Sequence, residues 1–110
     1  MGLDVRQISV LSNNYVYLVR ETESGLVAIV DPAEDSPVRA ALADLGWTPT
    51  HILNTHHHAD HTGGNLTLKQ DFGLTVVGPK ADAGRIPGID VALADGDSYA
   101  FGAATAKVFD

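Results

Sequence analysis

The stretch THHHADHTGGN, from Thr55 to Asn65, holds four of the five histidines in the 110-residue chain. In an extended segment, side chains at positions i and i+2 point to the same side, so His56 and His58 can converge on one point. If the chain turns after them, Asp60 and His61 can face a second point close to the first. Imidazole nitrogen and carboxylate oxygen are ordinary ligands of zinc, so these four side chains indicate a metal site.

The residues around these four fit the same interpretation. His57 points the other way if the segment is extended, so we do not count it as a ligand. Gly63 and Gly64 suit a tight turn where backbone passes close to a crowded site. Two metal ions about 3.5 to 4 Å apart can share a bridging hydroxide, which is a strong nucleophile at neutral pH. The pattern therefore predicts metal-assisted hydrolysis.

The segment His56–His61 resembles the His-x-His-x-Asp-His signature of the metallo-β-lactamase superfamily. The longer form, with the Thr-Gly-Gly-Asn that follows, resembles the glyoxalase II branch, the hydroxyacylglutathione hydrolases. Other stretches agree with that branch, so the similarity runs over nearly the whole chain: NYVYL at 14–18, VDPAE at 30–34, RIPG at 85–88 and LADGD at 93–97.

This resemblance implies an α+β fold, the N-terminal half of a four-layer αββα sandwich. Such a half is a mixed β-sheet with helices on one face. The implied reaction is hydrolysis of an S-(2-hydroxyacyl)glutathione thioester to glutathione and a 2-hydroxy acid. His56, His58, Asp60 and His61 would be metal ligands, and Asp60 would also act in catalysis by orienting the attacking hydroxide. Two divalent metal ions are expected, zinc first, with iron or manganese as the other choices.

The chain also departs from the family pattern. It ends at Asp110, before the place where glyoxalase II relatives continue with further metal ligands and a helical domain that binds glutathione. A catalytic zinc normally has three protein ligands, whereas this stretch supplies two for each metal. We therefore expect residues 1–110 to be a partial metallo-β-lactamase-like domain, either a fragment or a unit that needs a partner. Its uncovered sheet face would favour self-association.

Two other functions fit the same residues. One is an iron enzyme of the persulfide dioxygenase type, which uses the same motif. The three consecutive histidines, together with the RIPG stretch, favour the hydrolase. The other is a non-catalytic module that binds metal or associates with itself.

The composition is that of a globular domain, with 45% hydrophobic and 19% charged residues. The formal net charge of −7 argues against a nucleic acid or an anionic membrane as partner, because both need a basic surface. The absence of cysteine excludes a thiolate metal site and a cysteine nucleophile within this chain. No signal-peptide pattern or membrane-spanning apolar run is present, which indicates a cytoplasmic location.

Local patterns predict the order of the secondary structure. Ser36 and Pro37 suit the N-cap and first position of a helix with an apolar stripe at i, i+3, i+4 and i+7, which ends at Gly46. A second helix is expected over 64–72, with Leu66 or Leu68 buried, and a loop over 79–90. The predicted strands are 5–10, 15–20, 25–30, 50–54, 74–77, 91–93, 98–101 and 105–109.

Three single residues have assigned or open roles. Asp31 follows a buried strand, and in the superfamily an aspartate at this point lies behind the metal ligands. It could orient a ligand histidine through the ring N–H, or it could be a turn residue before Pro32, and the sequence leaves both open. His51 lies in a strand pattern and is assigned a structural or surface role. Trp47 is expected to pack against the core.

Overall fold

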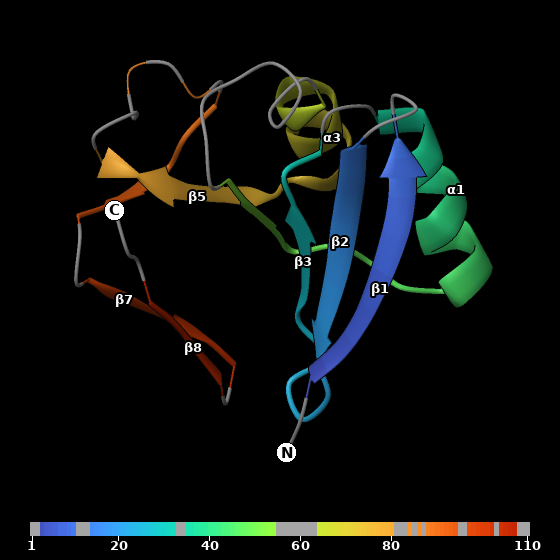
Figure 1. Ribbon diagram of the computed structural model, residues 1–110, viewed down its shortest axis with the longest axis horizontal. Coiled ribbons are helices and arrows are strands. Elements are labelled where there is room, and N and C mark those ends of the chain that lie inside the picture. The colour runs from blue at the N-terminus through green and yellow to red at the C-terminus, as the bar shows by residue number, and fades with distance from the viewer. Residues whose placement is uncertain are drawn as a thin grey trace.

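The structure is a computed structural model that describes residues 3–10, 14–32, 35–54, 64–80, 84, 86, 88–94, 97–102 and 104–107. Its two described helices are α1 (Asp35–Leu45) and α3 (Asn65–Phe72). The strands, shown with them in Figure 1, are β1 (Leu3–Val10), β2 (Asn14–Glu21), β3 (Val27–Val30), β4 (His51–Leu53), β5 (Thr75–Pro79), β6 (Val91–Leu93), β7 (Ser98–Phe101) and β8 (Ala104–Lys107).

These elements confirm the predicted strands and helices, with shifts of one or two residues at several ends. The predicted end of the last strand, residues 108 and 109, lies outside the described residues. The predicted start of the first helix is wrong: α1 begins at Asp35, so Ser36 lies in its first turn instead of capping it. Asp35 holds that turn by accepting a hydrogen bond from Arg39 Nε at 2.9 Å, and its charge suits a helix N-terminus. Pro37 remains in the first turn, where its missing N–H costs no hydrogen bond.

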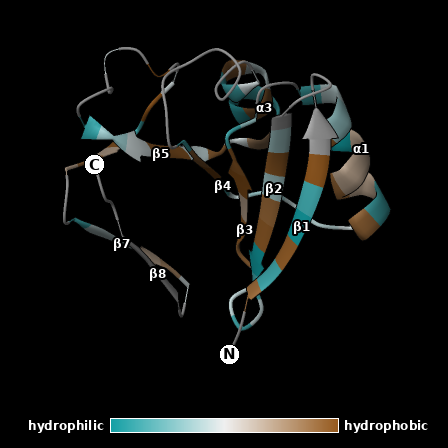
Figure 2. Cartoon of the chain, in the orientation of Figure 1, coloured by the Kyte–Doolittle hydropathy of each residue, from teal (hydrophilic) through white to brown (hydrophobic). Residues whose placement is uncertain are grey.

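Strands β1 to β6 form one mixed sheet in that order. The pairs β1–β2 and β2–β3 are antiparallel, whereas β3–β4, β4–β5 and β5–β6 are parallel. Strand β3 is apolar along its whole length and β1 alternates between apolar and polar residues (Figure 2). That difference reflects how the two faces are covered, since successive residues 27–29 of β3 are all buried, whereas Leu3 and Val5 of β1 are exposed on one face.

One face of the sheet packs against both helices. Val38 and Leu42 of α1 and Leu68 of α3 are buried in this core, and Ala41, Leu45 and Trp47 pack around it, as predicted. Of the two leucines proposed for α3, Leu68 is fully buried, whereas Leu66 is 59% exposed. The sheet contributes an aliphatic layer consisting of Val16, Leu18, Val27, Ile29, Ile52 and Val76.

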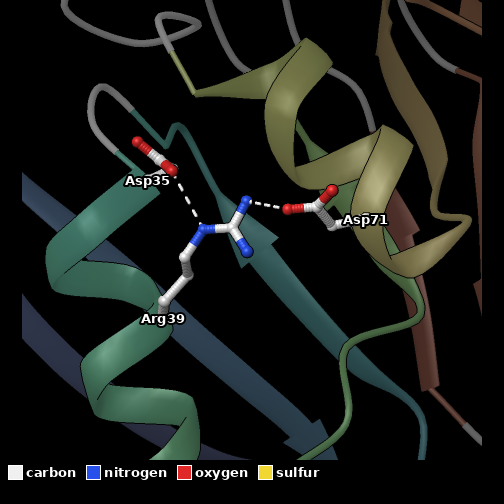
Figure 3. A network of polar contacts seen from close by, with 3 residues as sticks. All are labelled: Asp35, Arg39 and Asp71. Carbon is white, nitrogen blue, oxygen red and sulfur yellow. Dashed lines mark hydrogen bonds and ion pairs between the residues drawn. The ribbon is translucent and has the colours of Figure 1, made fainter.

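A charged contact joins the two helices at the surface. The Arg39 guanidinium of α1 donates hydrogen bonds to Asp35 of its own helix and to Asp71 of α3 (Figure 3). The same guanidinium lies 5.6 Å from the ring of Phe72. These side chains are partly exposed, so the contact is expected to add little to stability.

Strands β7 and β8 form a separate antiparallel hairpin. His51 and Ile52 are neighbours in β4, so they point to opposite faces of the sheet, and Ile52 belongs to the core under the helices. The His51 ring contacts the rings of Tyr99 and Phe101, with centroids 5.8 and 5.3 Å apart. The hairpin therefore lies on the face opposite the helices, and Figure 1 shows β3 between the hairpin and α1.

This second face is covered in part. Leu3, Val5, Tyr15 and Tyr17 are 52%, 53%, 51% and 38% exposed. The register pairs Leu3 with Glu21, Val5 with Val19 and Tyr17 with Val30, which places these apolar side chains on the same face as His51. The described part of the chain thus has an apolar surface of the kind predicted from the sequence.

Candidate metal centre

The predicted ligands His56, His58, Asp60 and His61, and the uncounted His57, lie outside the described residues. The structure describes the two residues from which their segment departs, Asn54 after β4 and Gly64 before α3. Within the described residues, no group of three or more His, Cys, Asp or Glu side chains could hold a metal ion. The assignment of residues 56–61 as metal ligands stays a prediction.

The two ends of this segment meet at the carboxyl ends of the parallel strands. Strands β3, β4 and β5 are parallel, so their carboxyl ends lie together, which is where α/β sheets commonly bind ligands. The Asp31 N–H donates to Leu53 O at 3.0 Å, and the Asn54 N–H donates to Val77 O at 2.8 Å. The Gly64 N–H donates to Pro32 O at 2.6 Å. The loop after β3 and both ends of the motif segment are thereby joined through the main chain.

Asp31, which follows β3 at this end of the sheet, has a left-handed backbone conformation. Its φ is 52°, the one positive φ of a non-glycine residue in the described part of the chain, and its side chain is 7% exposed. Aspartate tolerates the left-handed region better than most residues, yet the conformation costs on the order of 1 to 3 kcal/mol. The backbone fits the predicted turn before Pro32. The burial of the carboxyl group is what the alternative, orienting a ligand histidine, requires, and that role stays a prediction.

A buried amide pair links the two ends of the motif segment directly. Asn65 Nδ2 donates to Asn54 Oδ1 at 2.6 Å, and Asn54 Nδ2 donates to Asn65 Oδ1 at 3.4 Å. Asn54 is 6% exposed and Asn65 is fully buried. The sequence interpretation assigned neither residue a role. The available signal was their position, because they flank the histidine stretch on both sides.

His51 has the structural role that the sequence predicts. Thr50 Oγ1 lies 2.7 Å from His51 Nδ1 and 3.0 Å from Val27 O, and His51 Nε2 lies 3.1 Å from the Tyr99 hydroxyl. If the Thr50 hydroxyl donates to Val27 O, His51 Nδ1–H donates to Thr50 Oγ1, and Nε2 accepts from Tyr99. Burial lowers the pKa of His51 below its usual value, which favours this neutral ring.

The RIPG stretch has a packing role in its described residues. Ile86 is 4% exposed and belongs to the core, and Gly88 has a φ of 73°. Lys69 Nζ donates to Gly88 O at 2.7 Å and to Asp90 Oδ1 at 2.8 Å. The hydrogen bond from Lys69 holds the pKa of Asp90 below its usual range. These hydrogen bonds hold the loop before β6 against α3.

Comparisons with known proteins agree with the motif and with the fold. Residues 10–101 match the family model of the metallo-beta-lactamase superfamily. The hydroxyacylglutathione hydrolase of Methylococcus capsulatus is 56% identical over 108 residues, which cover 98% of this chain and 42% of that protein. The corresponding protein of Rhodospirillum rubrum is 53% identical over 108 residues, with the same coverage of 98% and 42%. The chain thus spans about two fifths of the length of these curated relatives.

Solved structures show the same fold. ETHE1 from Myxococcus xanthus superposes with a TM-score of 0.78 at 27% identity, covering 94% of this chain and 46% of that one. BJP-1, a subclass B3 metallo-beta-lactamase of Bradyrhizobium japonicum, gives a TM-score of 0.78 at 23% identity, covering 92% and 46%. The predicted α+β class, a mixed sheet with helices on one face, is confirmed. No described helix is long and apolar enough to cross a membrane. Since the family model covers most of the sequence and the fold recurs in these structures, this chain belongs to the metallo-β-lactamase superfamily.

Proposed function

We propose that this chain is the metal-binding part of a thioester hydrolase of the glyoxalase II type. Its substrate would be an S-(2-hydroxyacyl)glutathione. Water adds to the acyl carbon, the bond between that carbon and sulfur breaks, and the products are a 2-hydroxy acid and the glutathione thiol. The observation that carries the proposal is the 56% identity, over 98% of the chain, to a protein named hydroxyacylglutathione hydrolase.

The donor set of the motif fits a divalent metal. His56, His58 and His61 offer imidazole nitrogens and Asp60 offers a carboxylate, a combination that suits zinc and also accepts iron or manganese. When bound, such metals polarise a carbonyl oxygen and lower the pKa of a bound water. Asp60 would accept a hydrogen bond from the attacking water and so orient it toward the thioester carbonyl.

The ligand count bears on the catalytic unit. Four donors give two for each of two metals, whereas a catalytic zinc usually has three protein ligands. We therefore propose that catalysis needs donors in addition to those of residues 56–61, in a unit of which residues 1–110 are one part. The coverage of 42% of each curated relative supports this view.

Metal content per chain and hydrolysis of S-lactoylglutathione test the proposal together. His58→Ala should lower the zinc retained after dialysis, because it removes one of the predicted ligands. His57→Ala is the matched control, since His57 lies in the same run and is not counted as a ligand. Equal zinc retention in the wild type and in His58→Ala would contradict the assignment. Full turnover by the 110-residue chain with two metals bound would contradict the need for further donors.

The alternative iron-dependent dioxygenase is distinguished by its chemistry. It would retain iron and consume oxygen with glutathione persulfide, whereas the hydrolase consumes no oxygen. The 56% identity to a protein named hydroxyacylglutathione hydrolase favours the hydrolase.

Self-association is the second candidate function, favoured by the apolar surface of Leu3, Val5, Tyr15 and Tyr17. Exposed apolar side chains gathered on one sheet face favour pairing with another apolar surface. The 110-residue chain should then form dimers in sedimentation experiments, and the double variant Tyr15→Ser/Tyr17→Ser should be monomeric. A monomeric wild-type chain would contradict it.

The cytoplasmic location stays a prediction.

A further inference from the structure

Strand β1 is the outer strand of the six-stranded sheet. It is eight residues long, and among the described residues it pairs with β2 alone. Figure 1 shows it at the border of the sheet. In an antiparallel pair, alternate residues direct their N–H and C=O groups to one neighbour, so the other residues of β1 direct theirs away from β2. An edge of this kind is a template on which a further strand can form hydrogen bonds.

The two charged residues of β1 lie on one face of this edge. Arg6 pairs with Leu18 of β2, which is buried under the helices, and Asp4 precedes Arg6 by two positions. Both side chains therefore point to the helix-covered face. Arg6 Nε donates to Asp4 Oδ1 at 2.9 Å, and this bond holds the pKa of Asp4 below its usual range. The two side chains are 51% and 37% exposed, so they are charged and accessible at neutral pH.

The order of these residues makes β1 complementary to itself. Val5 lies between Asp4 and Arg6. If two copies of β1 meet in antiparallel orientation with Val5 opposite Val5, Asp4 of each copy faces Arg6 of the other, which is a favourable cross-strand pair. The neighbouring symmetric registers, centred on Asp4 or on Arg6, place like charges opposite each other. The charges of the edge therefore favour the register centred on Val5.

The opposite face of β1 is apolar in the same region. Leu3 and Val5 are 52% and 53% exposed, on the face of the sheet that the helices do not cover. In the register centred on Val5, the two Val5 side chains lie side by side, and each Leu3 lies beside Gln7 of the other copy. Pairing would thus remove part of this apolar surface from water, while the charges pair on the other face.

We propose that the free edge of β1 is an interface between two copies of this chain, which pair antiparallel about Val5 and join their sheets edge to edge. The contact is isologous, with main-chain hydrogen bonds between the strands and with Asp4 and Arg6 of the two copies setting the register. This interface is distinct from the self-association through the sheet face, because it uses the backbone edge of β1 and charges on the helix-covered side.

An introduced cysteine reports the register, since the chain contains none of its own. Directly opposite residues of antiparallel strands have Cα atoms about 4.5 to 5.5 Å apart, which suits a disulfide. Mild oxidation of Val5→Cys should therefore give a disulfide-linked dimer of the 110-residue chain on a non-reducing gel. Leu3→Cys is the matched control, because Leu3 is equally exposed on the same face. In this register the two Leu3 residues lie four positions apart along the strands, about 13 Å, which is too far for a disulfide.

Exchange of the charges tests the same register independently. In the Val5→Cys background, Asp4→Arg places two positive charges opposite each other and Arg6→Asp places two negative charges opposite each other. Each variant alone should lose about 5-fold or more of the cross-linked dimer. An equimolar mixture of the two should regain it as a mixed dimer, identified by its mass, because unlike charges meet again. Thermal unfolding of each variant shows that it is folded.

The outcomes separate this interface from the self-association through the sheet face. Cross-linking that is selective for Val5→Cys, lost in each charge variant and regained in the mixture supports the interface. Equal cross-linking of Val5→Cys and Leu3→Cys, or cross-linking that does not depend on the charges, overturns it. Wild-type dimers in sedimentation experiments without selective cross-linking of Val5→Cys also overturn it, and leave the self-association through the sheet face intact.

Discussion

The face of the six-stranded sheet under α1 and α3 is closed by aliphatic side chains, whereas the opposite face is covered in part, by polar and aromatic contacts of the β7–β8 hairpin. On the first face, Ile29 and Ile52 have no exposed surface. On the second, His51 meets Tyr99 and Phe101. Aliphatic burial is strong and non-directional, so it stabilises the sheet without requiring one partner. Hydrogen bonds and ring contacts are directional and set the position of the hairpin.

The hairpin makes a second close contact with the sheet, at Gly102 in its own turn. Gly102 lies so close to the β2–β3 turn that a Cβ added there would come within 2.3 Å of Ser24 Oγ and 2.6 Å of Glu21 Oε1. Glu21 is fully buried and cannot move away easily, because its carboxylate accepts the backbone N–H groups of Glu23 and Ser24 at 2.9 and 3.0 Å. If this description of the two faces is right, mutations on the helix-covered face and mutations on the hairpin-covered face should lower stability by different amounts.

The largest effect is expected on the helix-covered face. Ile52→Ala removes buried methyl groups and leaves a cavity, so it should lower the free energy of unfolding by about 2 to 5 kcal/mol. Urea denaturation of the 110-residue chain measures this loss. Val5→Ala is the control on the other face, where Val5 is 53% exposed and the expected change is within about 0.5 kcal/mol. Equal losses in the two variants would mean that the second face is as tightly closed as the first.

The next effect is expected at Gly102, in the turn of the hairpin. Gly102 and Gly25 have φ values of 60° and 76°, so alanine at either position is strained by roughly 1 to 2 kcal/mol. No atom of the described residues lies within 4 Å of a Cβ at Gly25, whereas Gly102 faces Ser24 and Glu21. Gly102→Ala should therefore lose about 1 to 3 kcal/mol more than Gly25→Ala in the same denaturation experiment. Equal losses would show that the two turns are not in close contact.

A smaller effect is expected from the hydroxyl of Tyr99. Tyr99→Phe keeps the ring contact with His51 and removes the hydrogen bond to Nε2, so the expected loss is about 0.5 to 1.5 kcal/mol. Tyr17→Phe removes the hydroxyl of a ring that is 38% exposed on the same face and serves as the control. Thermal unfolding at neutral pH compares the two. A larger loss of stability in the Tyr17 variant would show that the hydrogen bond between Tyr99 and His51 is not the important one on this face.

The smallest effect is a dependence on pH. Because burial lowers the pKa of His51 in the folded chain, the unfolded chain binds a proton at higher pH than the folded chain does. The neutral ring contributes stability above the unfolded pKa of about 6.5, and this contribution is lost as the pH falls through the lower folded pKa. The thermal midpoint of the wild type should therefore drop more steeply on acidification than that of His51→Gln. Parallel curves would exclude His51 as the source, since the other four histidines are present in both proteins.

The sequence predicted the parts of the fold that depend on local pattern. The apolar stripe of Val38, Ala41, Leu42 and Leu45 determines a helix and its buried side. The run from Val27 to Val30 determines a buried strand. These features depend on neighbours along the chain, so they can be inferred without knowing the tertiary contacts. The resemblance to the superfamily then supplied the order of the layers.

The contacts between distant residues could not be predicted in the same way. Tyr99 follows His51 by 48 positions, and no local pattern indicates that their side chains meet. Gly102 approaches the buried Glu21 from 81 positions along the chain, and Asp31, with its left-handed backbone, bonds through its N–H to Leu53 O of another strand. Asn54 and Asn65 become a pair only when the end of β4 and the start of α3 come together in the fold. The predicted ligands of residues 56–61 remain a prediction.

The amide pair has a consequence for reversibility. Neither Asn54 nor Asn65 gains or loses a proton between pH 5 and 8, whereas histidines titrate in that range unless a metal holds them. Mild acid should therefore release a bound metal by protonating its imidazole ligands, while the hydrogen bonds between Asn54 and Asn65 persist. We expect the chain to take up metal again on return to neutral pH without refolding, so repeated acid cycles should leave its metal capacity unchanged. A capacity that declines with each cycle would show that the amide pair breaks when the metal leaves.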